Sequence, residues 1–177
     1  LDLSNFVELR DATAALTMFQ TGIRISTLAQ LTESDFDLDN RLLTIGGEMM
    51  KAREPIQLPF DERLGMMLEA LLEQNDIIRT EKGVRNKNVF ITQHGGKLQT
   101  SATNNTLRKR LKLYEQEFGL QHLNPHALRR GFAKRLLDKG ASITFIAKAL
   151  GHSSTEVTAR YLYIDKVEVA NELRKFL

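Results

Sequence analysis

Residues 124–165 of this 177-residue chain read NPHALRRGFAKRLLDKGASITFIAKALGHSSTEVTARYLYID. The pattern predicts three successive short helices, because Pro125 is a favourable first helical residue and Gly140 and Gly151 stand where the first two helices would end. The segment also carries four side chains with reactive or anion-binding groups: His126, Arg129, His152 and Tyr161.

These four side chains suit chemistry on phosphate esters. A guanidinium binds two phosphate oxygens through paired hydrogen bonds, and a phenol can act as a covalent nucleophile. An imidazole can move a proton near neutral pH or hydrogen-bond a phosphate oxygen. His126 and Arg129 are three residues apart, so both project from one helix face. His152 on its own would be read as a partner for the negative end of the preceding helix.

The order and spacing of three motifs carry a family resemblance. H-x-x-R at 126–129, Leu150-Gly151-His152, and a tyrosine nine residues beyond that histidine resemble the C-terminal half of a tyrosine recombinase catalytic domain, of the phage integrase family. The resemblance implies that Tyr161 attacks DNA to form a 3′-phosphotyrosyl link. It also implies that Arg129, His126 and His152 hold the phosphate, with His126 as general base.

Residues 21–26, Thr-Gly-Ile-Arg-Ile-Ser, contain a second candidate site residue. Arg24 lies among apolar residues in the expected first turn of a short helix, and burying it would require an anionic partner. The alternative from the residues alone is a surface arginine whose stem covers the core. The hexapeptide also resembles the family's T-G-(L/I)-R-I-S box, which implies that Arg24 is the first catalytic arginine. The family usually has Glu where this chain has Thr27, and that glutamate supports the arginine side chain. The residues that support Arg24 must therefore differ here.

Residues 41–59 predict a β-hairpin or three-stranded ribbon, with strands at 41–45 and 56–58, a turn at Gly46-Gly47 and an end at Pro59. In the family, a lysine on this hairpin protonates the leaving 5′ oxygen, and Lys51 is the candidate. The alternative is an edge-strand lysine that discourages aggregation. Arg53 is a poorer candidate because its pKa is too high for a proton donor.

One departure from the family lies next to Arg129. The family helix commonly reads R-H-T-F or R-H-S-F, whereas this chain has Arg129-Arg130-Gly131-Phe132. Gly131 loses a hydroxyl that could contact DNA or a site residue, and glycine weakens a helix. The catalytic set itself is complete.

The distribution of charge indicates one DNA-facing side. Residues 1–40 hold seven acids and two bases, a balance of −5, whereas residues 101–139 hold nine bases and three acids, a balance of +6. The alternative explanation for the basic residues at 101–139 is a helix face that is exposed to solvent and does not bind DNA. The expected helix at 100–118 is the best candidate for following the DNA backbone. The candidate DNA-contact residues are Arg108, Lys109, Arg110, Lys112 and Arg130.

The remaining segments predict further helices and one more strand from apolar spacing. Tyr114 is expected in the core and His94 on a surface loop. The predicted elements are helices at 5–20 (N-cap Ser4, ended by Gly22), 61–80 and 166–176, and a strand at 89–92.

Composition is that of an ordinary globular protein, with 42% hydrophobic and 27% charged residues and a net charge of +3. The chain has no cysteine, and we expect no membrane span, no metal site and no cofactor. His122 and His126 have metal-ligand spacing, but Pro125 interrupts a helix across them and no third ligand accompanies them. Because the chain begins without Met, we expect residues 1–177 to be a single catalytic domain cut from a longer recombinase that also has N-terminal DNA-binding domains.

The sequence therefore predicts an α+β fold, mainly helical, with a small antiparallel sheet near the N-terminus. The resemblance implies site-specific recombination, such as integration or excision, on double-stranded DNA in the cytoplasm, with four copies on two duplexes. This fragment alone would be monomeric. Its last helix could pack on its own core or on a neighbouring copy. Three alternatives stay open: a type IB topoisomerase, a non-catalytic DNA-binding module of the same fold, and a helical interaction protein.

Overall fold

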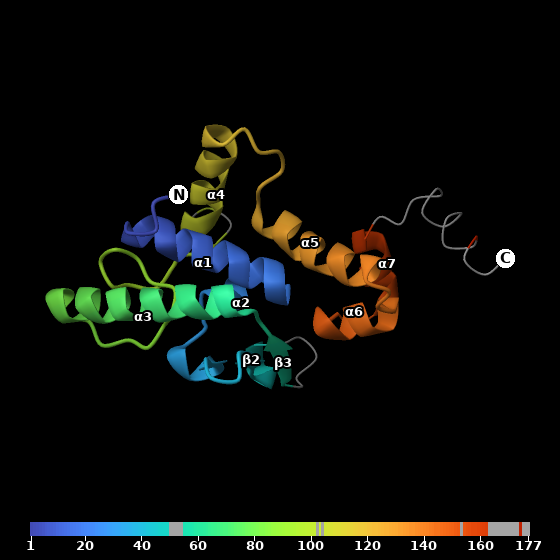
Figure 1. The fold of residues 1–177 in the computed structure, drawn as a ribbon, viewed down its shortest axis with the longest axis horizontal. Helices are drawn as coiled ribbons and strands as arrows, with labels where there is room; N and C mark the ends of the chain where they lie inside the picture. The colour runs from blue at the N-terminus through green and yellow to red at the C-terminus, as the bar shows by residue number, and fades with distance from the viewer. Residues whose placement is uncertain (50–54, 102, 104, 153, 163–173, 175–177) are drawn as a thin grey trace.

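Helix α1 (Phe6–Thr21) is the element against which several other helices pack (Figure 1). Helix α3 (Glu62–Lys82) lies alongside it, and α5 (Pro125–Asp138) packs against its C-terminal end. The computed structural model describes residues 1–49, 55–101, 103, 105–152, 154–162 and 174. Of the predicted helix at 166–176, only residue 174 belongs to the described residues. In the part of the chain that is described, no helix is both long and apolar enough to cross a bilayer.

The expected α+β architecture is confirmed. Three antiparallel strands in the order β1-β2-β3 form the small sheet: β1 (Phe36–Asp37), β2 (Leu42–Ile45) and β3 (Ile56–Pro59). The sequence did not predict β1, and β2 begins at Leu42 rather than at residue 41. Arg41 has a φ of 54°, which no extended strand residue adopts, and it ends the tight turn that the Asp37 side chain stabilises.

The start of α1 differs from the prediction by one residue. Asn5, not Ser4, is the N-cap, because its side-chain oxygen accepts hydrogen bonds from the backbone nitrogens of Val7 (2.9 Å) and Glu8 (3.2 Å). The Ser4 hydroxyl instead donates to Asp2. Gly22 ends the helix in the left-handed conformation, as expected.

Helix α1 buries polar side chains that the apolar pattern did not reveal. The hydroxyls of Thr13, Thr17 and Thr21 each donate to the carbonyl four residues earlier at 2.6–2.7 Å, so they need no partner outside the helix. These threonines can therefore lie in the interior at little cost.

The buried carboxylate of Asp11 fixes α4 (Thr106–Glu117) against α1. It accepts hydrogen bonds from Arg10 on its own helix, and from Arg110 and Tyr114 on α4, each of the α4 contacts at 2.9 Å. Burial, with the nearby Asp11 charge, raises the pKa of Tyr114 to about 12, so the phenol stays protonated and donates. Tyr114 is in the core, as predicted.

Two further sequence predictions need correction. Val89, Phe90 and Ile91 are fully buried but form no strand, since the described residues here make only isolated bridges. These residues are apolar because they are buried, not because they pair in a sheet. The periodicity of a short apolar run does not distinguish a buried loop from a buried strand. Helix α4 begins at Thr106 rather than at residue 100, because Asn105 caps it by accepting from the Arg108 nitrogen at 2.9 Å. The remaining described elements are α2 (Ile25–Leu28), α6 (Ile143–Ala149), α7 (Thr155–Leu162) and the 3-10 helices Glu33–Asp35 and Gly47–Met49.

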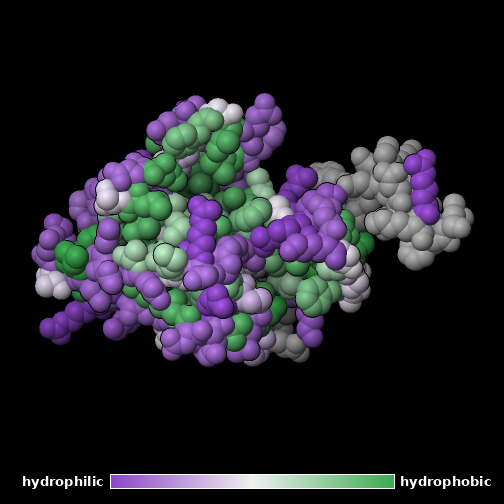
Figure 2. All heavy atoms as spheres, viewed as in Figure 1, coloured by the Kyte–Doolittle hydropathy of each residue, from purple (hydrophilic) through white to green (hydrophobic). Residues whose placement is uncertain are grey.

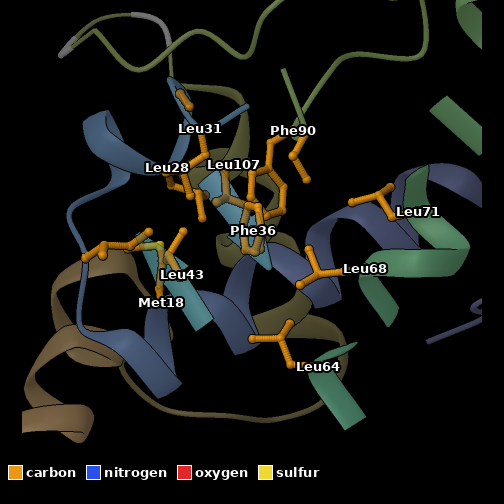
Figure 3. Close-up of a cluster of buried hydrophobic side chains, with 14 of the residues drawn as sticks. Met18, Leu28, Leu31, Phe36, Leu43, Leu64, Leu68, Leu71, Phe90 and Leu107 are labelled. Atoms are coloured by element: carbon orange, nitrogen blue, oxygen red, sulfur yellow. The ribbon is translucent and has the colours of Figure 1, made fainter. Parts of the chain in front are cut away.

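The described hydrophobic interior has two clusters. The larger one joins α1, α3, α4 and the sheet, and Figure 3 shows part of it around Met18, Leu43 and Phe90. The smaller one joins α5, α6 and α7 through Phe132, Ala133, Ile146, Leu150 and Leu162. Gly22, at the end of α1, packs against the smaller cluster, because a Cβ there would strike the Phe132 ring and the Leu150 side chain.

We therefore predict that Gly22→Ala is much more destabilising than Gly83→Ala. Both glycines have a φ near 65°, which costs an alanine about 1–2 kcal/mol, but a Cβ at Gly83 meets nothing within 4 Å. The clash with Phe132 should add about 1–3 kcal/mol at Gly22. Urea unfolding followed by circular dichroism measures both changes, and equal losses of free energy would contradict this packing.

Candidate active site

The first turn of α5 positions two of the predicted site residues. Asn124 caps the helix by accepting a hydrogen bond from the Ala127 nitrogen at 3.0 Å, and Pro125 occupies the first helical position, as predicted. His126 is exposed in the first turn, whereas Arg129, one turn further along, is 5% exposed. The H-x-x-R spacing therefore places one group at the surface and one in the interior.

The Arg129 guanidinium joins the ends of two helices. It donates to the carbonyl of Gly22, just beyond α1, and at 2.7 Å to the carbonyl of Leu150, the C-cap of α6. Carbonyls at helix C-termini lack intrahelical partners and carry the negative end of the helix dipole. These two carbonyls offset part of the cost of burying a cation, since hydrogen bonds to a charged donor are strong.

His152 continues this network toward α7. Its Nε2 lies 3.2 Å from the Arg129 Nη2, and its Nδ1 lies 2.9 Å from the Thr158 Oγ1. Its backbone nitrogen donates to the Ala147 carbonyl at 2.9 Å and helps to close α6 beyond Gly151. The ring thus connects the buried arginine to the helix whose backbone includes Tyr161. Thr158 is a contact that the sequence motifs did not single out.

The segment between α1 and α2 carries Arg24. Arg24 is the N-cap of α2 with extended φ and ψ of −76° and 151°, so it precedes the helix rather than lying in its first turn. It follows by two residues the glycine whose carbonyl binds Arg129. Its partly exposed side chain makes no hydrogen bond or ion pair to the residues that the structure describes. Thr27, where the family usually has Glu, is buried in α2.

The close approach of α1 and α5 explains the glycine at position 131. A Cβ there would lie 2.9 Å from a ring carbon of Phe19 on α1, which is tighter than real Cβ atoms tolerate. The family's hydroxyl-bearing residue would therefore require the Phe19 ring to shift at this point. Glycine thus lets the Phe19 ring lie directly against α5, the helix from which Arg129 reaches the Gly22 carbonyl.

A groove of about 1100 Å³ runs from α4 to the start of α5. Arg108, Lys109 and Lys112 of α4 line it, together with His126 and with Ile25, the residue after Arg24. Arg110 lines a separate hollow and is paired with Asp11, so it also holds α4 in place. Arg130 is exposed on α5. On the face shown in Figure 2, hydrophilic side chains cover α5 and hydrophobic ones gather over α4.

Two predicted catalytic groups cannot be placed. Lys51 lies outside the described residues, and so does the side chain of Tyr161, although the backbone of Tyr161 lies in α7. Tyr163, two residues beyond Tyr161, is also outside them. Within the described residues, no group of three or more His, Asp or Glu side chains is arranged to hold a metal ion.

The model of the phage integrase family matches residues 2–168. The chain belongs to the phage integrase family. It is 30% identical over 172 residues to tyrosine recombinase XerC of Treponema denticola, covering 93% of the chain and 55% of that protein. It is 31% identical over 162 residues to XerC of Pseudomonas entomophila, covering 91% of the chain and 50% of that protein. The chain thus spans about half the length of these relatives.

Solved recombinase structures share the fold. A crystal structure of XerA recombinase superposes with a TM-score of 0.77 at 22% identity, covering 96% of the chain and 57% of XerA. The XerH recombinase bound to its difH substrate, a pre-cleavage complex, superposes with a TM-score of 0.72 at 26% identity. The match covers 98% of the chain and 48% of XerH. The phage integrase fold predicted from the sequence is therefore confirmed.

We predict that Arg129→Lys lowers the free energy of unfolding by about 2 kcal/mol. One ammonium group cannot span two helix ends and an imidazole, so at least one buried carbonyl loses its partner. Arg130→Lys on the exposed side of α5 is the matched control, with an expected loss under about 0.5 kcal/mol. Urea unfolding measures both free energies of unfolding. A loss of free energy for Arg129→Lys no larger than for Arg130→Lys would refute the role of Arg129 in joining the two helix ends.

Proposed function

We propose that this chain is the catalytic domain of a tyrosine-type site-specific DNA recombinase, which cuts and rejoins DNA through a 3′-phosphotyrosyl intermediate. The observation that carries the proposal is the network from Arg129 through His152 to Thr158. It brings a buried cation to the segment that holds Arg24 and to the helix that holds Tyr161. Family membership supports the same reading.

In the proposed reaction, the Tyr161 oxygen attacks the phosphorus of a DNA phosphodiester in line with the 5′ oxygen. The P–O5′ bond breaks as the bond from phosphorus to the tyrosine oxygen forms, which leaves a 3′-phosphotyrosyl link. His126 takes the phenolic proton, and Lys51 gives a proton to the departing 5′ oxygen. A 5′-hydroxyl of the partner duplex then reverses these steps, so the phosphodiester is restored without another energy source.

The arginines and His152 have the task of stabilising charge. As phosphorus becomes five-coordinate, negative charge grows on its non-bridging oxygens, and fixed cations in a partly dry site lower that barrier. Arg24 and Arg129 supply the cations, and His152 adds a hydrogen bond. The arrangement of Arg129 supports this role because its position is set by two backbone carbonyls before any DNA arrives.

Double-stranded DNA is the proposed partner. The groove lined by Arg108, Lys109 and Lys112 leads to His126, so the DNA backbone could follow α4 to the reaction centre. Arg130, exposed on the same helix as His126, is a further candidate contact, and Arg110 remains one despite its pairing with Asp11. The XerH neighbour was captured on its DNA substrate, which supports the same partner here.

Four copies of the full-length protein would act together on two aligned duplexes, at DNA within the cell. This domain alone would bind DNA weakly and remain a monomer, because the rest of the DNA clamp lies in other domains. The proposal covers integration, excision and dimer resolution alike, since all of them use the same cleavage chemistry.

We predict that the full-length protein forms a covalent adduct with a nicked DNA substrate that traps cleavage. The adduct should be absent for Tyr161→Phe, because phenylalanine has no nucleophilic oxygen, and retained for the matched variant Tyr163→Phe. A denaturing gel measures it, and candidate target sites come from DNA flanking the source gene.

Three results would contradict the proposal in different ways. An adduct that survives Tyr161→Phe moves the nucleophile to another residue. Relaxation of supercoiled DNA without strand exchange assigns type IB topoisomerase activity instead. Absence of any adduct on DNA that the protein binds at a defined site assigns a non-catalytic binding module.

A further inference from the structure

Thr158 is a buried polar residue in contact with the ring of His152. Its side chain is fully enclosed, with 0% exposure, and its Oγ1 lies 2.9 Å from the His152 Nδ1. The other ring nitrogen, Nε2, lies 3.2 Å from the Arg129 Nη2. The imidazole is thus held between a hydroxyl on α7 and a guanidinium on α5.

The chemistry of these two neighbours assigns the ring proton. A guanidinium nitrogen has donors and no acceptor, so the Nε2 that faces Arg129 must accept with its lone pair. A neutral imidazole then carries its proton on Nδ1, and that N–H donates to the Thr158 hydroxyl oxygen. A threonine hydroxyl can accept this bond and still donate its own hydrogen elsewhere.

We propose that Thr158 is a positioning residue, which holds the proton of His152 on Nδ1 and keeps Nε2 directed at the Arg129 site. Since Nδ1–H is committed to Thr158, Nε2 is the nitrogen left to face the substrate phosphate. It takes up a proton there, which makes His152 an imidazolium, and the new N–H donates to a phosphate oxygen. The same bond ties α7, the helix of Tyr161, to the arginine. This inference rests on the proposed function for its catalytic consequence, but the proton assignment stands on the geometry alone.

The competing explanation is that Thr158 only fills space between α7 and its neighbours. Two substitutions separate the explanations because they remove different parts of the side chain. Thr158→Val keeps the branched shape and removes the hydroxyl, whereas Thr158→Ser keeps the hydroxyl and removes a methyl group. A filling role predicts that Val is tolerated and Ser is damaging, and a positioning role predicts the reverse order.

The first readout is the ¹⁵N spectrum of the imidazoles in histidine-labelled full-length protein without DNA. The His152 signals are assigned by their loss in His152→Gln. We expect a protonated Nδ1 and an unprotonated Nε2 in wild type and in Thr158→Ser, and a mixture of tautomers in Thr158→Val. An unprotonated Nδ1 in the wild type, or an unchanged Thr158→Val spectrum, overturns the inference.

The second readout is the rate of adduct formation on the nicked substrate at saturating DNA. We expect Thr158→Val to be slower by about 10- to 100-fold, the usual effect of losing a group that orients a catalytic ligand, with Thr158→Ser within about 3-fold of wild type. Urea unfolding and DNA affinity are measured for both variants to show that they fold and bind. Equal rates for wild type and Thr158→Val would overturn the inference.

The two readouts separate this inference from the proposed function. If the wild type forms no adduct, the proposed function fails, while the ¹⁵N spectra still decide whether Thr158 sets the tautomer. If the wild type cleaves and Thr158→Val matches it in both readouts, the proposed function stands and the role of Thr158 is refuted.

Discussion

The hydrogen bonds from the Arg129 guanidinium to the carbonyls of Gly22 and Leu150 are the constraint on which the arrangement of the site depends. A buried cation is costly unless its donors are satisfied, and the C-terminal ends of two helices provide carbonyls that have no other helical partner. Meeting both carbonyls fixes where α1, α5 and α6 stand relative to one another. Leu150, one of the two carbonyl partners, also belongs to the smaller hydrophobic cluster, so the site is tied to the packing of α5, α6 and α7.

The rest of the site is arranged around this arginine by short-range contacts. His152 touches Arg129 on one side and Thr158 on the other, which links α7 to the centre. The Asp11 carboxylate lies away from Arg129 and holds α4 in place through its ion pair with Arg110. The neighbouring bases of α4 then line the groove that leads to His126. The basic helix α4 thus serves two purposes, because Arg110 pairs with the buried Asp11 while Arg108, Lys109 and Lys112 line the groove.

The sequence predicted the parts of this account that rest on local signals. Pro125 and the glycines at 22, 140 and 151 marked helix ends correctly, because capping depends on neighbouring residues alone. The sequence did not predict contacts between segments that are far apart along the chain. The burial of the α1 threonines, the pairing of Arg110 with Asp11, and the need for glycine beside Phe19 all depend on segments distant in sequence. Lys51 and the Tyr161 side chain remain predictions, since both lie outside the described residues.

The central claim is that the place where Arg129 meets His152 is where a DNA phosphate reacts. A structure of the full-length Tyr161→Phe variant bound to its uncut target DNA tests this most directly. The account predicts the phosphate at the cleavage site within hydrogen-bond distance, about 3 Å, of Arg24, Arg129 and His152, with the duplex backbone along α4. A structure with the DNA bound on another face, or with the phosphate remote from Arg129, would contradict it.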